Sequence, residues 1–126
     1  MAIVGIGVDA VEIDRMRRAL ERTPTLADRV FTVTELAQCR SRGDRLRPAR
    51  LAGRFAAKEA VAKAFGTGVV GFSFRDVAVV NDDGGAPVIV LANAARAVAE
   101  RCGITRVHVS LSLTGGIAVA TAVAEA

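Results

Sequence analysis

The chain has 126 residues, a formal net charge of +4 and a sequence pI of about 10.0, and this length predicts one domain spanning residues 1–126. Although 52% of the residues are hydrophobic, no apolar run approaches the roughly 18 residues of a membrane span, so we expect no membrane segment. The chain lacks Trp and Tyr, and its five Phe are not interleaved with the basic clusters, which argues against nucleic-acid binding.

Hydrophobic periodicity predicts strands and helices that do not alternate regularly. The predicted elements are a strand at 3–10, a helix at about 12–22, short helical pieces near 25–31 and 34–41, a long helix at about 48–65, strands near 75–81 and 87–91, a helix at about 92–102, and strands at 106–113 and 117–124. We therefore predict an α+β fold with a mostly antiparallel sheet and the long helix packed across it. The last strand is polar on neither face, so both faces need a cover, and one cover can be a neighbouring subunit.

The first strand carries one acid beside two residues without side chains. Period-two alternation places Gly5, Gly7 and Asp9 on the same face. Glycine in a strand marks a bulge or the close approach of a ligand or another backbone. Asp9 is then either a residue near the start of the following helix or one half of a cation site.

The long helix carries a stripe that suits a metal-bound phosphate ligand. Phe55, Glu59 and Lys63 recur at helical spacing, and the helix ends in Gly66-Thr67-Gly68. The carboxylate can hold a hard cation, the ammonium can neutralise phosphate oxygens, and the glycines leave room for a ligand. The alternative is a surface Glu–Lys pair on a helix capped by glycine.

The first helix carries a basic stripe, formed by Arg15, Arg18 and Arg22. Like charges at this spacing repel one another, and an acidic partner helix would relieve the repulsion. The clustering of positive charge in this helix and between Arg40 and Lys63 predicts anionic partners.

Three segments together resemble the holo-acyl-carrier-protein synthase family, the small trimeric 4′-phosphopantetheinyl transferases. They are residues 5–13 (GIGVDAVEI), residues 54–68 (RFAAKEAVAKAFGTG) and residues 108–112 (HVSLS). The resemblance implies the 4′-phosphopantetheinyl transferase fold and a homotrimer with active sites between subunits. It also implies Mg²⁺-dependent transfer of 4′-phosphopantetheine from coenzyme A to a serine of an acyl carrier protein, with release of 3′,5′-ADP.

The same resemblance implies roles for individual residues. Asp9 and Glu59 would hold Mg²⁺ and act in catalysis with Lys63, which would meet the pyrophosphate. The residues expected to bind coenzyme A are Arg54, Lys63, Gly66, Thr67, Gly68, Pro87 and His108. His108 is alternatively a structural residue at a subunit contact. Arg15, Arg18 and Arg22 would dock the carrier protein, and the Arg45–Arg50 cluster would join Arg54 at the 3′-phosphate. For the general base, metal-bound water, Glu35 and Lys63 remain open.

The chain departs from the family pattern at two positions. Ala86 stands where relatives often carry Lys or Arg, and Leu113 stands where they usually carry His. We still expect an active enzyme of lipid metabolism, with a catalytically weakened trimeric scaffold of the same fold as the alternative. Cys39 and Cys102 lie far apart without metal-binding spacing, so we expect both to stay reduced in the cytoplasm.

Overall fold

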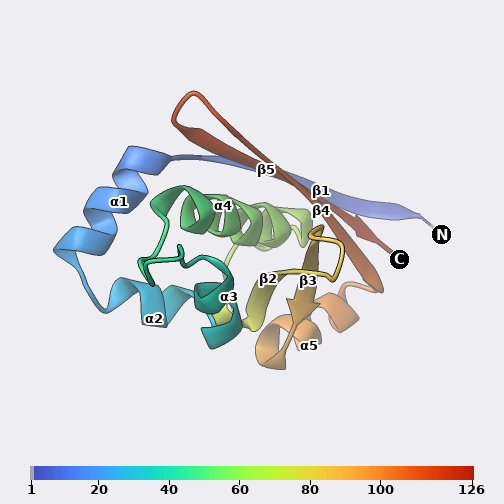
Figure 1. Cartoon of the computed structure of the whole chain (residues 1–126). Helices are drawn as coiled ribbons and strands as arrows, with labels where there is room; N and C mark the ends of the chain where they lie inside the picture. Colours follow the sequence, from blue (N-terminus) through green and yellow to red (C-terminus); the bar gives the residue numbers. More distant parts are fainter. Residues whose placement is uncertain (1) are drawn as a thin grey trace.

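The computed structural model describes residues 2–126, whose helices and strands confirm the predicted α+β fold (Figure 1). The elements are β1 (Ile3–Glu12), α1 (Ile13–Arg22), α2 (Leu26–Val30), α3 (Val33–Gln38), α4 (Pro48–Ala64), the 3₁₀ helix η1 (Phe74–Asp76), β2 (Val77–Asn81), β3 (Pro87–Leu91), α5 (Asn93–Arg101), β4 (Arg106–Thr114) and β5 (Ile117–Glu125). Within residues 2–126, no helix is long and apolar enough to cross a membrane.

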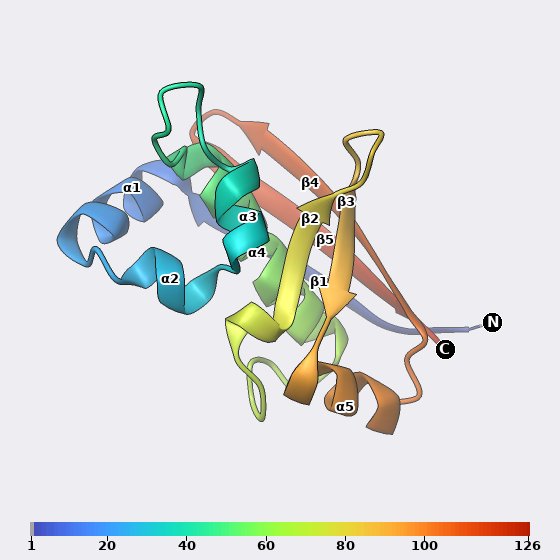
Figure 2. The same cartoon turned by 60° about the horizontal axis from the view of Figure 1, so that its bottom comes forward.

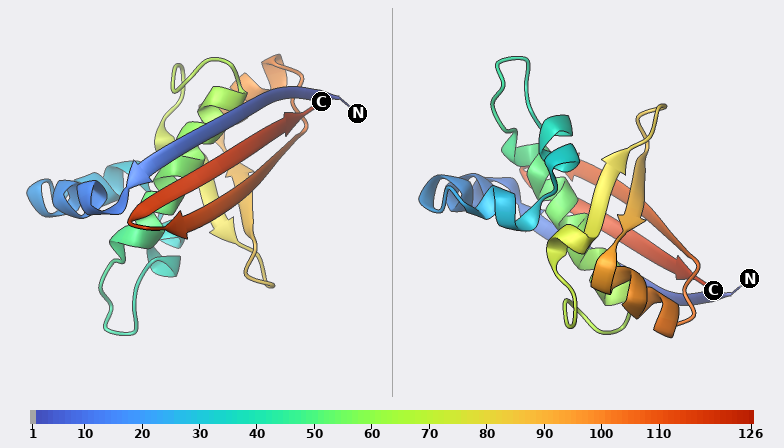
Figure 3. Two further views of the ribbon diagram at one scale, coloured as in Figure 1. Left: turned by 90° about the horizontal axis from the view of Figure 1, so that it is seen from above. Right: turned by 90° about the horizontal axis from the view of Figure 1, so that it is seen from below.

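The strands pair antiparallel, as predicted, and divide between two sheets. One sheet has the order β1-β5-β4, and β2 pairs with β3 in a separate hairpin. The long helix α4 crosses one face of the three-stranded sheet, and the β2–β3 hairpin lies on the other side of α4 (Figures 1 and 3). The helix therefore forms a central layer between the two sheets.

Contact between β1 and α4 is close enough that the two backbones touch. A Cβ atom built on Gly7 would lie 1.9 Å from the carbonyl oxygen of Ala60, and one on Gly5 would lie 1.8 Å from that of Ala64. The gap beside Asp9 is thus filled by the backbone of α4, and β1 also has a register shift between Ile3 and Gly5.

The last strand, β5, packs its small side chains under α4. Its inward-facing alanines are fully buried, and they are Ala118, Ala120, Ala122 and Ala124. On the opposite face of the sheet, β1 and the start of β5 expose apolar side chains, with Ile6 at 65%, Val8 at 56% and Ile117 at 40% exposure. Within this chain no helix covers that outer face, as the view from above shows for residues 2–126 (Figure 3).

A buried ion pair closes the free edge of β2. Lys58 Nζ donates to Glu35 Oε1 at 2.8 Å and to the carbonyl oxygens of Phe74 at 2.9 Å and Val77 at 2.8 Å. Glu35 Oε2 accepts from the Val79 backbone N–H at 2.9 Å. Burial lowers the pKa of Lys58, and the neighbouring Glu35 opposes that shift. Side chains from α3 and α4 thus pair with backbone groups that a further strand would otherwise use.

Glu35 is therefore wrong as a candidate general base. Its side chain is fully buried and also accepts from the Thr32 backbone N–H at 2.9 Å, which completes a capping box at the start of α3. A carboxylate with these partners holds helices together and is out of reach of a substrate hydroxyl.

We expect Gly7→Ala to destabilise the fold by more than about 3 kcal/mol, because the new methyl group meets the α4 backbone, which cannot move as a flexible side chain does. Chemical denaturation followed by circular dichroism measures the effect. Gly43→Ala is the control, since its Cβ would meet only Ser41 Oγ at 3.8 Å. Equal stability of the two variants would contradict the close contact.

Candidate active site

The ends of β1 and α4 bring together the three residues predicted for catalysis. Lys63 Nζ, on the last turn of α4, donates to Asp9 Oδ1 at 3.1 Å and to the Val8 carbonyl oxygen at 3.0 Å. Glu59 lies one helical turn before Lys63. The glycine contact in β1 places the strand near enough to α4 for Lys63 to reach across to Asp9.

The carboxyl groups of Asp9 and Glu59 lie close enough for the charge of Asp9 to act on Glu59. Burial, and then the negative charge of Asp9, raise the pKa of Glu59, and the ammonium of Lys63 opposes the rise. A pair of neighbouring carboxylates suits a hard divalent cation, whose charge would relieve their repulsion. Residues 2–126 contain no cluster of three or more potential metal ligands, so further ligands would come from water or substrate phosphate oxygens.

A cavity of about 570 Å³ opens beside these residues. It is lined by residues from β1, α1, α2 and α4, among them Asp9, Arg15, Arg22, Phe55, Glu59 and Lys63. Arg15 and Arg22 therefore share one surface with the acidic pair. Arg18 does not line this cavity, and its Nη1 lies 3.3 Å from Asp14 Oδ2.

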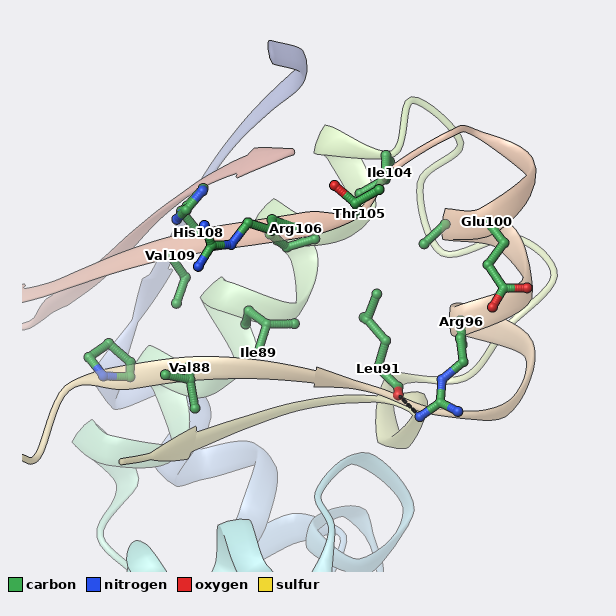
Figure 4. Close-up of a pocket in the computed structure, with 13 residues that line it drawn as sticks. Val88, Ile89, Leu91, Arg96, Glu100, Ile104, Thr105, Arg106, His108 and Val109 are labelled. Carbon is green, nitrogen blue, oxygen red and sulfur yellow. Dashed lines mark hydrogen bonds between the residues drawn. The ribbon is translucent and has the colours of Figure 1, made fainter. Parts of the chain in front are cut away.

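A second cavity of about 600 Å³ lies between β3, α5 and β4 (Figure 4). Pro87 and His108 line it, together with Arg96 and Arg106, over a floor that includes Ile89. His108 is half-exposed, and its Nε2 lies 3.5 Å from Glu125 Oε2. The structure thus places two of the residues predicted to bind coenzyme A in a different cavity from the acidic pair.

Lys63 lines the first cavity, and the remaining predicted binding residues line neither of the two cavities. Arg54 is only 7% exposed, and its Nη2 donates to Gln38 Oε1 at 3.4 Å. The turn after α4 holds Gly66 and Gly68 at φ angles of 81° and 64°, a conformation that favours glycine. Thr67 Oγ1 donates to the Gly68 carbonyl oxygen at 2.9 Å, so the hydroxyl is used within the turn.

The two departures from the family pattern lie at exposed positions. Leu113 is 48% exposed, and its Cδ2 would lie 3.5 Å from a Cβ built on Gly53 of α4. It continues the face of β4 that packs on α4, as the alternation of its strand predicts. Ala86 lies in the turn before β3, where its N–H donates to Asp82 Oδ1 at 2.9 Å.

Sequence reasoning assigned no role to Lys58 or Gln38, which organise the region around β2. The available signal was the composition of α4, since a charged residue among so many buried alanines must find a partner inside the protein. The partner itself, Glu35, lies 23 residues away, and helical periodicity does not report contacts at that separation.

Comparison with known proteins places the whole chain among related sequences and structures. The model of the 4′-phosphopantetheinyl transferase superfamily matches residues 5–122. A holo-acyl-carrier-protein synthase of Frankia casuarinae is 49% identical over 125 residues, covering 99% of each chain. The crystal structure of such a synthase from Neisseria meningitidis superimposes with a TM-score of 0.88 at 37% identity, covering 99% of this chain and 100% of the other. A Helicobacter pylori synthase in complex with coenzyme A gives a TM-score of 0.83 at 28% identity, covering 95% and 99%.

The raised pKa of Glu59 predicts how metal-free stability depends on pH. Protonation of Glu59 favours folding at low pH, and this contribution is lost as the pH rises through the folded-state pKa. Metal-free Glu59→Gln should therefore be more stable than the unsubstituted protein at about pH 7 and equal to it below about pH 4.

Thermal unfolding in EDTA at both pH values measures this difference. Adding MgCl₂ should then stabilise the unsubstituted protein more than the variant, because only the former keeps both carboxylates. Glu100→Gln, at an exposed position of α5, is the control and should change neither comparison. A Glu59→Gln variant that is less stable at neutral pH would contradict the assignment of the shift.

Proposed function

The chain belongs to the 4′-phosphopantetheinyl transferase superfamily as an enzyme of the holo-acyl-carrier-protein synthase type, and we propose that its transfer reaction is Mg²⁺-dependent and releases 3′,5′-ADP. The observation that carries the proposal is the junction of Asp9, Glu59 and Lys63 at one cavity. The coenzyme A complex of the Helicobacter pylori relative supports coenzyme A as the donor substrate.

The chemistry requires neutralisation of charge more than covalent participation by the protein. The carrier serine oxygen forms a bond to the phosphorus next to pantetheine and releases its hydroxyl proton to the solvent, and the bond from that phosphorus to the bridging oxygen breaks, so 3′,5′-ADP leaves with the electron pair. Lys63 would stabilise charge on phosphate oxygens, and its hydrogen bond to Asp9 would hold the ammonium in position. Asp9 and Glu59 would hold Mg²⁺, which supplies further positive charge to the pyrophosphate when bound.

The carrier protein is proposed to dock on α1. Arg15 and Arg22 line the same cavity as Glu59 and Lys63, so an acidic helix bound there would bring its serine to the reacting phosphate. Arg18 is less available, because Asp14 partly neutralises it. The proposed docking residues remain Arg15, Arg18 and Arg22, with the largest contributions from the two that line the cavity.

The complete site is proposed to form between subunits of a homotrimer. Arg54 and Lys63 are nine residues apart on α4, which places them about 180° apart around the helix axis. Within one chain, the acidic pair therefore lies on one side of α4 and Arg54 lies on the opposite side. The cavity lined by Pro87 and His108 lies apart from both, between β3, α5 and β4. The exposed apolar face of the sheet supports burial against a second copy.

In the assay that tests the reaction, an apo carrier protein is incubated with coenzyme A and Mg²⁺ and analysed by mass spectrometry. Asp9→Asn and Lys63→Ala should each lower kcat by about 10²-fold or more, because the first removes a charged ligand proposed for Mg²⁺ and the second removes positive charge at the phosphate. Asp28→Asn, at an exposed position of α2, is the control and should retain full activity. Lack of phosphopantetheine addition by the unsubstituted protein with every carrier tested would favour the scaffold function.

The same preparation tests the shared site. Sedimentation should report a particle near three times the 13.1 kDa chain mass, and a fully active monomer at assay concentration would contradict a site built from two chains.

Charge reversal tests docking on α1. Arg22→Glu should raise the KM for the carrier protein about threefold or more and weaken its salt dependence, because an attractive charge becomes repulsive. The KM for coenzyme A should stay unchanged. Arg101→Glu, which makes the same charge change on α5, is the matched control. Equal effects of the two reversals on carrier binding would place the docking surface elsewhere.

A further inference from the structure

Gln38, the last residue of α3, joins two segments that contain expected coenzyme A ligands. Its Oε1 accepts from the Asn81 backbone N–H at 2.9 Å and from Arg54 Nη2 at 3.4 Å, and its Nε2 lies 3.5 Å from the Asn81 carbonyl oxygen (α3, α4 and β2 in Figure 2). Asn81 is the antiparallel partner of Pro87 in the β2–β3 hairpin. One amide side chain therefore connects Arg54 of α4 to the strand pair at Pro87.

The buried Arg54 guanidinium has a hydrogen-bond donor that is not satisfied within residues 2–126. The residue is 7% exposed, and within residues 2–126 its Nε has no hydrogen-bond partner. A buried cation with unused donors is costly, so the site favours an anion that can accept from the remaining N–H groups. Gln38 is neutral, so it can fix the direction of the guanidinium without cancelling its charge.

We propose that Gln38 is a positioning residue that orients Arg54 toward a phosphate monoester of the substrate and keeps it in register with Pro87. The inference rests on the proposed function, in which that group is the 3′-phosphate of coenzyme A. Arginine recognises phosphate through a planar fork of donors, so binding depends on its angle as well as its charge. A hydrogen bond from the amide oxygen to one terminal nitrogen restricts that angle.

Two substrates that differ by one phosphate test the role. We expect Gln38→Met, which keeps the side-chain length but removes all three side-chain hydrogen bonds, to raise the KM for coenzyme A about tenfold, the size of one hydrogen bond to a charged group. The KM for 3′-dephospho-coenzyme A should change less than about twofold, and so should kcat at saturating coenzyme A. Calorimetric titration with 3′,5′-ADP should show the same tenfold weakening without any reaction.

A double-mutant cycle and a control variant in α3 distinguish a positioning role of Gln38 from a general loss of stability. Arg54→Met should show the same selective loss, and Gln38→Met should add nothing to it, because the amide acts through the guanidinium. Thr32→Ala removes the N-cap of the same helix, α3, but leaves the Gln38 contacts in place. It should lower stability without changing discrimination between the two substrates.

Three results would overturn the inference. They are equal KM shifts for the two substrates, additive losses in the double variant, and the same selective loss in Thr32→Ala. If the unsubstituted protein transfers no phosphopantetheine at all, the proposed function fails. If it does transfer and Gln38→Met is unselective, only the role of Gln38 fails.

Discussion

The backbone contact between β1 and α4 is the constraint on which the site depends. Gly5 and Gly7 have no Cβ, so the strand lies directly on the helix, and Asp9 at the same face comes within reach of Lys63. Any larger residue would separate the two elements by the size of a side chain. The salt bridge at 3.1 Å would then have to span a wider gap. The acid and the ammonium, 54 residues apart in sequence, thus meet because of residues that have no functional group of their own.

The helix α4 combines this close packing with buried charge on its other side. Its alanines allow β1 and β5 to approach, whereas Lys58 and Arg54 lie toward α3 and β2. Lys58 uses three donors on Glu35 and two carbonyl oxygens, so its charge is fully paired. Arg54 keeps a buried Nε without a partner within residues 2–126. This difference is why we propose an anionic ligand for Arg54, whereas Lys58 stabilises the fold.

Local sequence patterns predicted the helices, the strands and the two residues of the acidic pair. They did not predict contacts between residues far apart in the sequence. Alternation in β1 placed Asp9 on the face of the two glycines, and helical spacing in α4 placed Glu59 on the face of Lys63. Both patterns reflect backbone geometry. The same reasoning could not identify Glu35 as a buried structural residue, since its burial depends on Lys58 and the edge of β2. The division of the strands into two sheets has the same cause. Side chains at the free edge of β2 replace a neighbouring strand, and sequence periodicity carries no record of that replacement.

Helical geometry also supports the proposed homotrimer. A single helix cannot direct Lys63 and Arg54 toward the same ligand from opposite sides of its axis, yet a pyrophosphate donor with a further phosphate needs positive charge at both ends. In the proposed homotrimer, copies packed around the exposed apolar sheet face would bring Lys63 of one subunit toward Arg54 of the next. The outer residues Ile6, Val8 and Ile117 would then be buried by the same step that completes the site. Under this arrangement, assembly and substrate binding would be coupled, because the same packing of subunits buries the sheet face and brings the two cations to one ligand.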